Sequence, residues 1–222
     1  MTESGRDSGK VAPGPGRRSE RGPTPTPFTT DPLNQQPIDD LCLRLADALK
    51  RDPRGTQVPA RLAEYASEHD DWRSMLHFSK DSYTRNLVHR CGPFEMLLLG
   101  WGAGHESPVH DHSGQQCWMA VLEGELEEVH LRSTPEGLAE GRSKVFKTGE
   151  VAYIQDEIAL HLIRPRGGQP AVSLHLYAKP IDTCMTFDRV TGKPCEVPLS
   201  YHSVRGVLCE DDPADHVRAQ FA

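Results

Sequence analysis

The sequence has no excess of positive charge and no long apolar segment. Its 25 Lys and Arg are outnumbered by 32 Asp and Glu, which gives a formal net charge of −7. Because a phosphate backbone requires a basic surface, this balance argues against a nucleic-acid partner. No stretch approaches the roughly 20 apolar residues of a membrane-spanning helix, and the pair at 17–18, Arg-Arg, is not followed by the apolar segment of an export signal. We therefore expect a cytoplasmic protein with neither a nucleic-acid nor a membrane partner.

Paired cysteines are also missing. The six cysteines are scattered and form no Cys-x-x-Cys pair, which argues against a zinc knuckle and against a tight disulfide scaffold. In a reducing cytosol most of them should be free thiols. The 36% hydrophobic and 26% charged residues are ordinary for a globular protein, and 222 residues suffice for one domain with a sizeable core.

The composition divides the chain into three parts. Residues 1–35 are rich in Gly, Pro, Ser and Thr and lack apolar periodicity, so they cannot bury enough surface to offset their ordering entropy. We expect a disordered Pro/Gly-rich tail there. A single domain should occupy 36–205, and 206–222 should form an acidic C-terminal tail that begins with Glu210, Asp211 and Asp212.

Apolar periodicity predicts two helices followed by many strands. Residues 38–49 and 58–65 carry apolar side chains at helical spacing. Short apolar or alternating runs then follow at 94–101, 117–122, 125–131, 151–155 and 171–177. So many short strands indicate an antiparallel sandwich or barrel. We expect a hairpin turn at 123–125 and a polar surface loop at 133–147.

The most informative stretch surrounds two histidines, His110 and His112. Alternate side chains of a strand share a face, so both rings can bind one cation. Two imidazoles leave most coordination positions open for a third ligand, water or a substrate, which suggests catalysis. An isolated His-x-His could equally be a surface feature, so the surrounding residues decide.

Those surroundings resemble the cupin pattern, with Gly104, His110, His112, Cys117 and Gly124 at its fixed positions. Most cupins carry a glutamate where this chain has Cys117. That cysteine is similar to the one in the thiol dioxygenases, and the segment from 83 to 184 resembles the cysteine dioxygenase family, with the likeness extending over about 40–205. The resemblance implies a mainly β, cupin-type barrel of jelly-roll-like form with N-terminal helices.

A second segment, 149–161, resembles the other cupin motif and makes His161 the expected third ligand, with His175 and Glu106 as competitors. Three neutral histidines would leave a metal its full double charge and attract a substrate thiolate. Imidazole and thiolate ligands suit iron, copper or zinc better than magnesium or calcium. The resemblance implies one iron(II) per chain.

The strand expected at 171–177 alternates between an apolar and a polar face. A half-exposed strand is the simpler alternative. In the dioxygenase family the polar face looks into the barrel, which implies that Ser173, His175 and Tyr177 hydrogen-bond in sequence and hold the phenol near the metal. The family also implies that Cys117 can be oxidatively joined to the ring of Tyr177 through a thioether.

Upstream, Tyr83 and Arg85 resemble the family segment that receives the substrate carboxylate, for which a guanidinium is well shaped. Enzymes that prefer 3-mercaptopropionate tend to carry glutamine at this position, so Arg85 favours L-cysteine. An exposed arginine before a strand is the simpler alternative.

The sequence thus predicts an iron(II) dioxygenase that oxidises L-cysteine with O₂ to cysteine sulfinic acid, and we expect a monomer. Alternatives are a dioxygenase of 3-mercaptopropionate or cysteamine, a non-catalytic cupin that senses or stores a metal or small ligand, and a zinc hydrolase or isomerase.

Overall fold

The computed structural model describes residues 36–112, 114–154 and 160–209. The expected tail at 1–35 lies outside these ranges, as does the segment at 155–159 that precedes His161. In the described part the helical elements are α1 (Pro37–Arg51), α2 (Val58–Glu68) and the 3₁₀ helix η1 (Asp71–Met75). The strands are β1 (Thr84–Arg90), β2 (Phe94–Trp101), β3 (Val109–His110), β4 (Cys117–Glu123), β5 (Glu125–Thr134), β6 (Gly137–Lys147), β7 (Val151–Ile154), β8 (Leu160–Pro165), β9 (Ala171–Ala178), β10 (Thr183–Phe187), β11 (Pro194–Pro198), β12 (Ser203–Val204) and β13 (Val207–Leu208).

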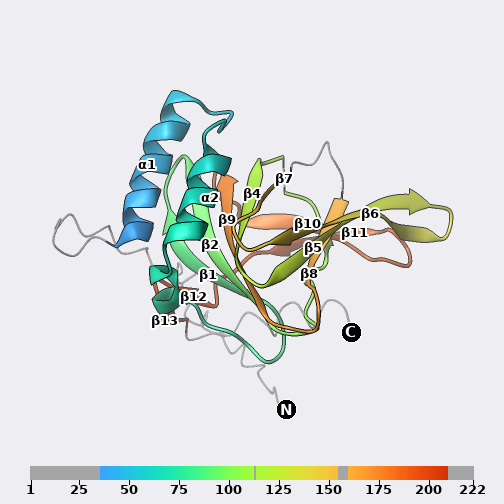
Figure 1. The fold of residues 1–222 in the computed structure, drawn as a ribbon. Helices are drawn as coiled ribbons and strands as arrows, with labels where there is room; N and C mark the ends of the chain where they lie inside the picture. Colours follow the sequence, from blue (N-terminus) through green and yellow to red (C-terminus); the bar gives the residue numbers. More distant parts are fainter. Residues whose placement is uncertain (1–35, 113, 155–159, 210–222) are drawn as a thin grey trace, which may run out of the picture.

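The two predicted helices are present and lie against one sheet (Figure 1). Helix α1 begins with Pro37 and carries Asp39 and Asp40 in its first turn and Lys50 and Arg51 in its last, which matches the helix dipole at both ends. Its apolar stripe is buried, as is that of α2. The helices thus form because each presents one apolar face that the sheet covers.

The strands form two sheets that face each other (Figure 1). One has the order β13-β12-β1-β2-β9-β4-β7 and the other the order β11-β10-β3-β8-β5-β6. Strand β1 pairs with β12 in parallel, and the other pairs among the described strands are antiparallel. The predicted mainly β fold with N-terminal helices is confirmed, but the two sheets form a jelly-roll-like sandwich and do not close into one barrel.

Alternation within β2, β4 and β9 gives the molecule two apolar layers. One side of these strands packs on the helices, for example through Met96, Trp118 and Leu174. The other side faces the six-stranded sheet, for example through Leu97 and Met119. Polar groups on this inner side are therefore held between the two sheets.

The loop expected at 133–147 is wrong, because Gly137–Lys147 forms strand β6. This strand lies at the edge of the six-stranded sheet and pairs only with β5 among the described strands. Most of its side chains are exposed or half-buried. Water on both faces removes the apolar alternation by which a strand is recognised in a sequence.

The hairpin expected at 123–125 is also wrong. Strand β4 belongs to the seven-stranded sheet and β5 to the six-stranded one, so this turn carries the chain between sheets. Gly124 has φ +78° there, and a Cβ at this position would lie 2.8 Å from the carbonyl oxygen of Pro170. The turn requires glycine for both its backbone conformation and this close approach.

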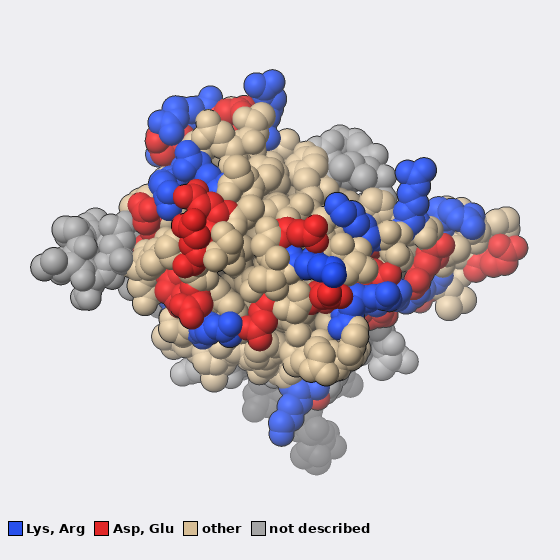
Figure 2. Space-filling model, viewed as in Figure 1, with Lys and Arg blue, Asp and Glu red and all other residues tan. Residues whose placement is uncertain are grey.

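The face seen in Figure 2 carries acidic and basic side chains side by side. Two ion pairs lie on α1, where Arg44 is 2.9 Å from Asp40 and Arg51 is 2.6 Å from Asp47.

None of the helices in the described ranges has the length and apolar character needed to cross a membrane. Strand β13 lies beyond residue 205, where we expected the domain to end.

Candidate metal centre

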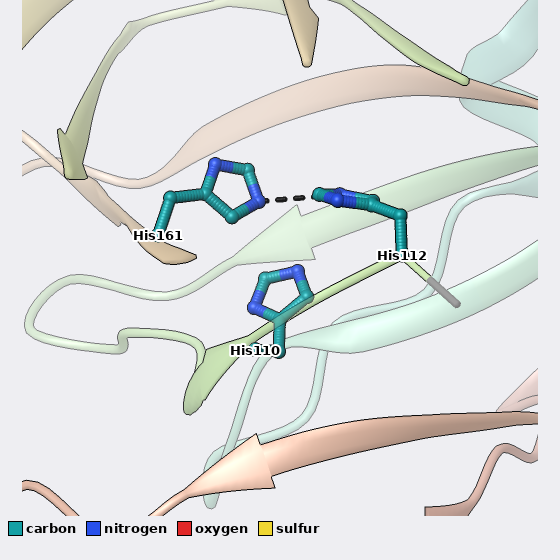
Figure 3. Close-up of side chains that lie close together, drawn as sticks. All are labelled: His110, His112 and His161. Atoms are coloured by element: carbon teal, nitrogen blue, oxygen red, sulfur yellow. Dashed lines mark hydrogen bonds between the residues drawn. The ribbon is translucent and has the colours of Figure 1, made fainter. Parts of the chain in front are cut away.

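Three histidines meet between the two sheets (Figure 3). His110 ends strand β3, His112 follows it by two residues, and His161 on β8 pairs directly opposite His110. The ring nitrogens that these residues offer all lie within 4.8 Å of one another. His112 Nε2 and His161 Nε2 are 3.2 Å apart.

Hydrogen bonds on the outer side of the cluster set the orientation of two rings. Nδ1 of His110 donates to the carbonyl oxygen of Pro108 at 2.9 Å, and Nδ1 of His161 donates to Glu128 Oε1 at 2.8 Å. Each of these rings then presents the lone pair of its Nε2. Such outer partners fix the tautomer and direction of histidines that bind metals.

The cluster suits a divalent transition metal. Two imidazole nitrogens bound to one ion at about 2.1 Å would lie roughly 3.0 to 3.4 Å apart, close to the spacing of His112 and His161. Burial, together with the neighbouring His110 and His112, holds the pKa of His161 well below its usual value. The ring is therefore neutral at pH 7, as a metal ligand must be.

Neither competitor for the third ligand position belongs to this cluster. The carboxylate of Glu106 is half-exposed and lies 3.3 Å from Arg189. Nε2 of His175 lies 2.9 Å from the hydroxyl of Ser173. The described histidines, cysteines and carboxylates thus offer His161 rather than His175 or Glu106 as the partner of His110 and His112.

The polar face of β9 is buried, and the Tyr177 ring on this face lies 6.0 Å, centroid to centroid, from the His112 ring of the cluster. Trp101 Nε1 donates to Ser173 Oγ at 2.9 Å, so the Ser173 hydroxyl can donate its own proton to Nε2 of His175. Nδ1 of His175 then lies 3.9 Å from Cys117 Sγ. Between His175 and Tyr177 the contact is a ring stack with centroids 6.1 Å apart, and in the described part no hydrogen bond joins them. The predicted contact between Ser173 and His175 is thus present, but the other ring nitrogen of His175 faces Cys117 instead of forming a hydrogen bond with Tyr177.

Cys117 and Tyr177 lie directly opposite each other on the neighbouring strands β4 and β9. Burial and the nearby Cys117 raise the pKa of Tyr177 well above its usual value, so the phenol keeps its proton at neutral pH. Burial also raises the pKa of Cys117, and Glu128 adds to that effect. Both groups are therefore neutral and side by side.

Arg85 lies on β1 with its side chain only 11% exposed. Its Nε donates to the carbonyl oxygen of Ser200 and its Nη2 to Glu95 Oε1, both at 3.3 Å. Its Cζ lies 6.0 Å from the centroid of the Tyr177 ring. The simpler expectation of an exposed arginine before a strand is wrong. Tyr83 lies nearby, and its ring stacks on Trp101 with centroids 4.8 Å apart.

One cavity of about 70 Å³ connects these groups. It is lined by the three histidines, by the polar side chains of the neighbouring strands and by apolar ones such as Leu99, Met119 and Ile154. Of the nine residues predicted to form a site, eight line this cavity; Ser173 lies behind His175. The arrangement places three imidazoles, a guanidinium and a phenol around a space suited to a small molecule.

Two carboxylates near the site escaped the sequence analysis. Glu95 had a recognisable signal, since it is the only charged residue in the apolar run 94–101, and a charge is seldom buried without a partner. The sequence offers no such signal for Glu128, because it adjoins Glu127 in a strand that carries both polar and apolar residues on each face.

Comparison with known proteins gives one family. The sequence model of the family "Cysteine dioxygenase type I" matches residues 29–190. Cysteine dioxygenase type 1 of Homo sapiens is 35% identical over 185 residues, covering 80% of this chain and 92% of the relative. The Danio rerio protein of the same name is 33% identical over 184 residues with the same coverage. Among solved structures, an uncharacterized double-stranded β-helix protein from Klebsiella pneumoniae has 15% identity and a TM-score of 0.42, covering 60% of this chain and 97% of its own.

Proposed function

Given that this chain belongs to the cysteine dioxygenase type I family, we propose that it binds one iron(II) ion through His110, His112 and His161 and oxidises L-cysteine with O₂. Two S–O bonds form and the O–O bond breaks, giving cysteine sulfinic acid. Sulfur loses the four electrons that O₂ accepts, so no other reductant is needed. The observation that supports this proposal best is the meeting of three imidazoles, a guanidinium and a phenol around one cavity.

The donor set agrees with iron(II). Three neutral imidazoles suit a divalent transition ion and leave its charge uncompensated, which favours a thiolate as a further ligand. When bound there, iron would supply the redox-active centre that a spin-forbidden reaction of a thiol with O₂ requires. The protein supplies the binding, orientation and electrostatics.

In this proposal Arg85 binds the substrate carboxylate. The Nε and Nη2 edge of its guanidinium already faces Ser200 and Glu95, so the end of the fork with Nη1 remains for a ligand. Two parallel hydrogen bonds from a guanidinium match the two carboxylate oxygens. Tyr83, held by its stack on Trp101, would provide a second contact.

Tyr177 would hold its phenol proton as a hydrogen-bond donor toward the reacting sulfur and oxygen atoms. Its raised pKa keeps that proton in place at neutral pH. Ser173 and His175 fix the strand face beside it through their hydrogen bond. The apolar lining of the cavity limits the access of water, which strengthens each of these polar contacts.

Anaerobic loading of the full-length protein with ferrous ion, followed by addition of L-cysteine in aerated buffer, should give oxygen uptake of one O₂ per sulfinate formed. An oxygen electrode and quantification of cysteine sulfinic acid measure the two quantities. Zinc-loaded protein is the control and should consume no oxygen, because zinc has no accessible redox change.

The same assay with 3-mercaptopropionate and cysteamine tests the choice of thiol. A higher kcat/KM with either of these thiols than with L-cysteine would contradict the proposal that L-cysteine is the substrate. Full loading with iron but no uptake with any thiol would reject the enzyme and favour a protein that stores or senses a metal.

The pairing of Cys117 with Tyr177 leads to a chemical prediction. Turnover with iron and substrate should join Cys117 Sγ to the Tyr177 ring, next to its hydroxyl, with loss of two hydrogens to oxygen. Direct opposition on neighbouring strands brings the two side chains within reach of each other. Mass spectrometry of tryptic peptides should show the two peptides linked and 2 Da lighter than their sum, since two hydrogens are lost.

The Cys117→Ser variant is the control and should give only separate peptides. Wild-type protein that remains unlinked after many turnovers would contradict the prediction.

Two further expectations stay predictions. All six cysteines lie in the described part and are free thiols, which supports a reducing, cytoplasmic location. We also propose that the chain acts as a monomer, which sedimentation of the iron-loaded protein would test.

A further inference from the structure

Glu95 is a fully buried carboxylate on the inner face of the seven-stranded sheet. Its exposure is 0%, and it pairs across the sheet with Arg90 on β1 and with Tyr177 on β9. It does not line the cavity itself. A buried carboxylate is costly unless it is fully paired, so its contacts show what this residue does.

Both oxygens of Glu95 accept hydrogen bonds. Oε2 accepts from the Tyr201 hydroxyl at 2.7 Å and from Arg90 Nη1 at 2.8 Å. Arg90 also donates to Tyr201 and, at 2.6 Å, to Asp182. The carboxylate is therefore held in place by two groups that lie away from the cavity, and its position does not depend on a ligand.

The other oxygen, Oε1, accepts from Arg85 Nη2 at 3.3 Å, while the Ser200 carbonyl accepts from Arg85 Nε at the same distance. These two acceptors lie along one edge of the guanidinium and fix its plane. Among the described residues, Nη1 of Arg85 donates to no protein acceptor. The Nε and Nη2 edge of the guanidinium is thus held by protein acceptors, and Arg85 itself lines the cavity.

We propose that Glu95 is a positioning residue that orients Arg85 for the carboxylate of the substrate, and that Tyr201 and Arg90 hold Glu95 for this task. The inference rests on the proposed function, since it assigns Arg85 to the substrate carboxylate. It adds that recognition depends on a second carboxylate inside the protein, behind the arginine.

Two effects of removing the Glu95 charge oppose each other. Loss of a nearby negative charge would strengthen the attraction of Arg85 for an anion. It would also weaken one of the two anchors of the guanidinium plane, because an amide has only one accepting oxygen for the two sides that Glu95 now serves, and it would leave Arg85 and Arg90 without the anion they share. Because a bidentate contact depends on direction as well as charge, we expect the loss of orientation to dominate.

The test compares iron-loaded wild type with Glu95→Gln, which keeps the shape and removes the charge. We expect the KM for L-cysteine to rise by roughly tenfold, with kcat changed much less, because a ground-state contact is weakened. The second measurement is the anaerobic shift in Tm on adding L-cysteine or cysteamine, which has the same thiol and amine but no carboxylate. The shift with L-cysteine should shrink and that with cysteamine should stay the same.

Tyr201→Phe should also raise the KM for L-cysteine, but by less. This variant provides the test if Glu95→Gln does not fold. Glu127→Gln is the matched control, since Glu127 is also a buried carboxylate that pairs with two arginines, but its partners Arg164 and Arg166 do not line the cavity. It should change neither KM nor the ligand-induced shifts in Tm.

An unchanged or lower KM for L-cysteine in Glu95→Gln, or an equal loss of the cysteamine shift, would overturn the role of Glu95 while leaving the proposed function intact. Iron-loaded wild type that consumes no oxygen with L-cysteine would overturn the proposed function and this inference together.

Discussion

Replacing Arg85 with glutamine should raise the apparent KM for L-cysteine by about 100-fold while the bound iron stays unchanged. The guanidinium is only 11% exposed, so a substrate carboxylate beside it would have little water to replace its partner. A hydrogen bond to a charged group contributes about 1.5–3 kcal/mol, and about 2.7 kcal/mol corresponds to a factor of 100. Oxygen-uptake kinetics and metal analysis of the same preparation measure both quantities.

The variant should still fold, because Glu95 keeps its bonds from Tyr201 and Arg90. Arg164→Gln is a suitable control: Arg164 is also paired with carboxylates, Glu127 and Glu140, but lies outside the cavity. Its KM should equal that of wild type. If Arg85→Gln retained wild-type kinetics with L-cysteine, Arg85 would not be the carboxylate-binding residue.

The sequence predicted most where structure is local. His110 and His112 share one strand end, so their proximity follows from strand geometry alone. The alternation in 171–177 likewise predicted two faces of β9, and the structure separates them: Val172, Leu174 and Leu176 pack on the helix side, whereas His175 and Tyr177 line the cavity. Family membership and a mainly β fold followed from the order and spacing of such local motifs.

Contacts between residues far apart in the sequence were harder to predict. His161 approaches His110 because β8 pairs with β3, and only the likeness to a second cupin motif pointed to it. Strand β1 was not predicted, because an asparagine such as Asn86 is more typical of a loop. In the structure Asn86 is buried, and its side chain forms hydrogen bonds with Leu98, Thr84 and Ser203. When the hydrogen-bond partners of a buried polar or charged residue lie far away in the sequence, the sequence pattern does not show that the residue is buried.

The carboxylates behind the site illustrate the same limit. The role of Glu128 depends on β5 pairing with β8, which brings it to Nδ1 of His161. Neighbouring Glu127 bonds instead to Arg164 and Arg166. Two adjacent, identical residues thus differ in function only through the strand face on which they lie, and the packing of the sheets decides which face is which.

Replacing His161 with alanine should weaken iron binding by more than about 100-fold and remove oxygen uptake with L-cysteine. Loss of an outer hydrogen-bond partner alone costs about 10–100-fold in metal affinity, and loss of a ligand costs more. Competition with a chelator of known affinity measures the binding, and the oxygen electrode measures the activity.

Glu128→Gln should give an intermediate result, with affinity about tenfold lower, because the amide supports Nδ1 of His161 less well than a carboxylate does. His130→Gln is the matched control. His130 pairs opposite His161 and lies 3.7 Å from the same Glu128 oxygen, yet it is outside the cluster of three rings. A variant without His161 that bound iron as tightly as wild type, or a His130 variant that lost it, would show that the metal lies elsewhere. The graded order of the three variants separates a ligand from the residue that orients it, and both from a histidine that is merely near.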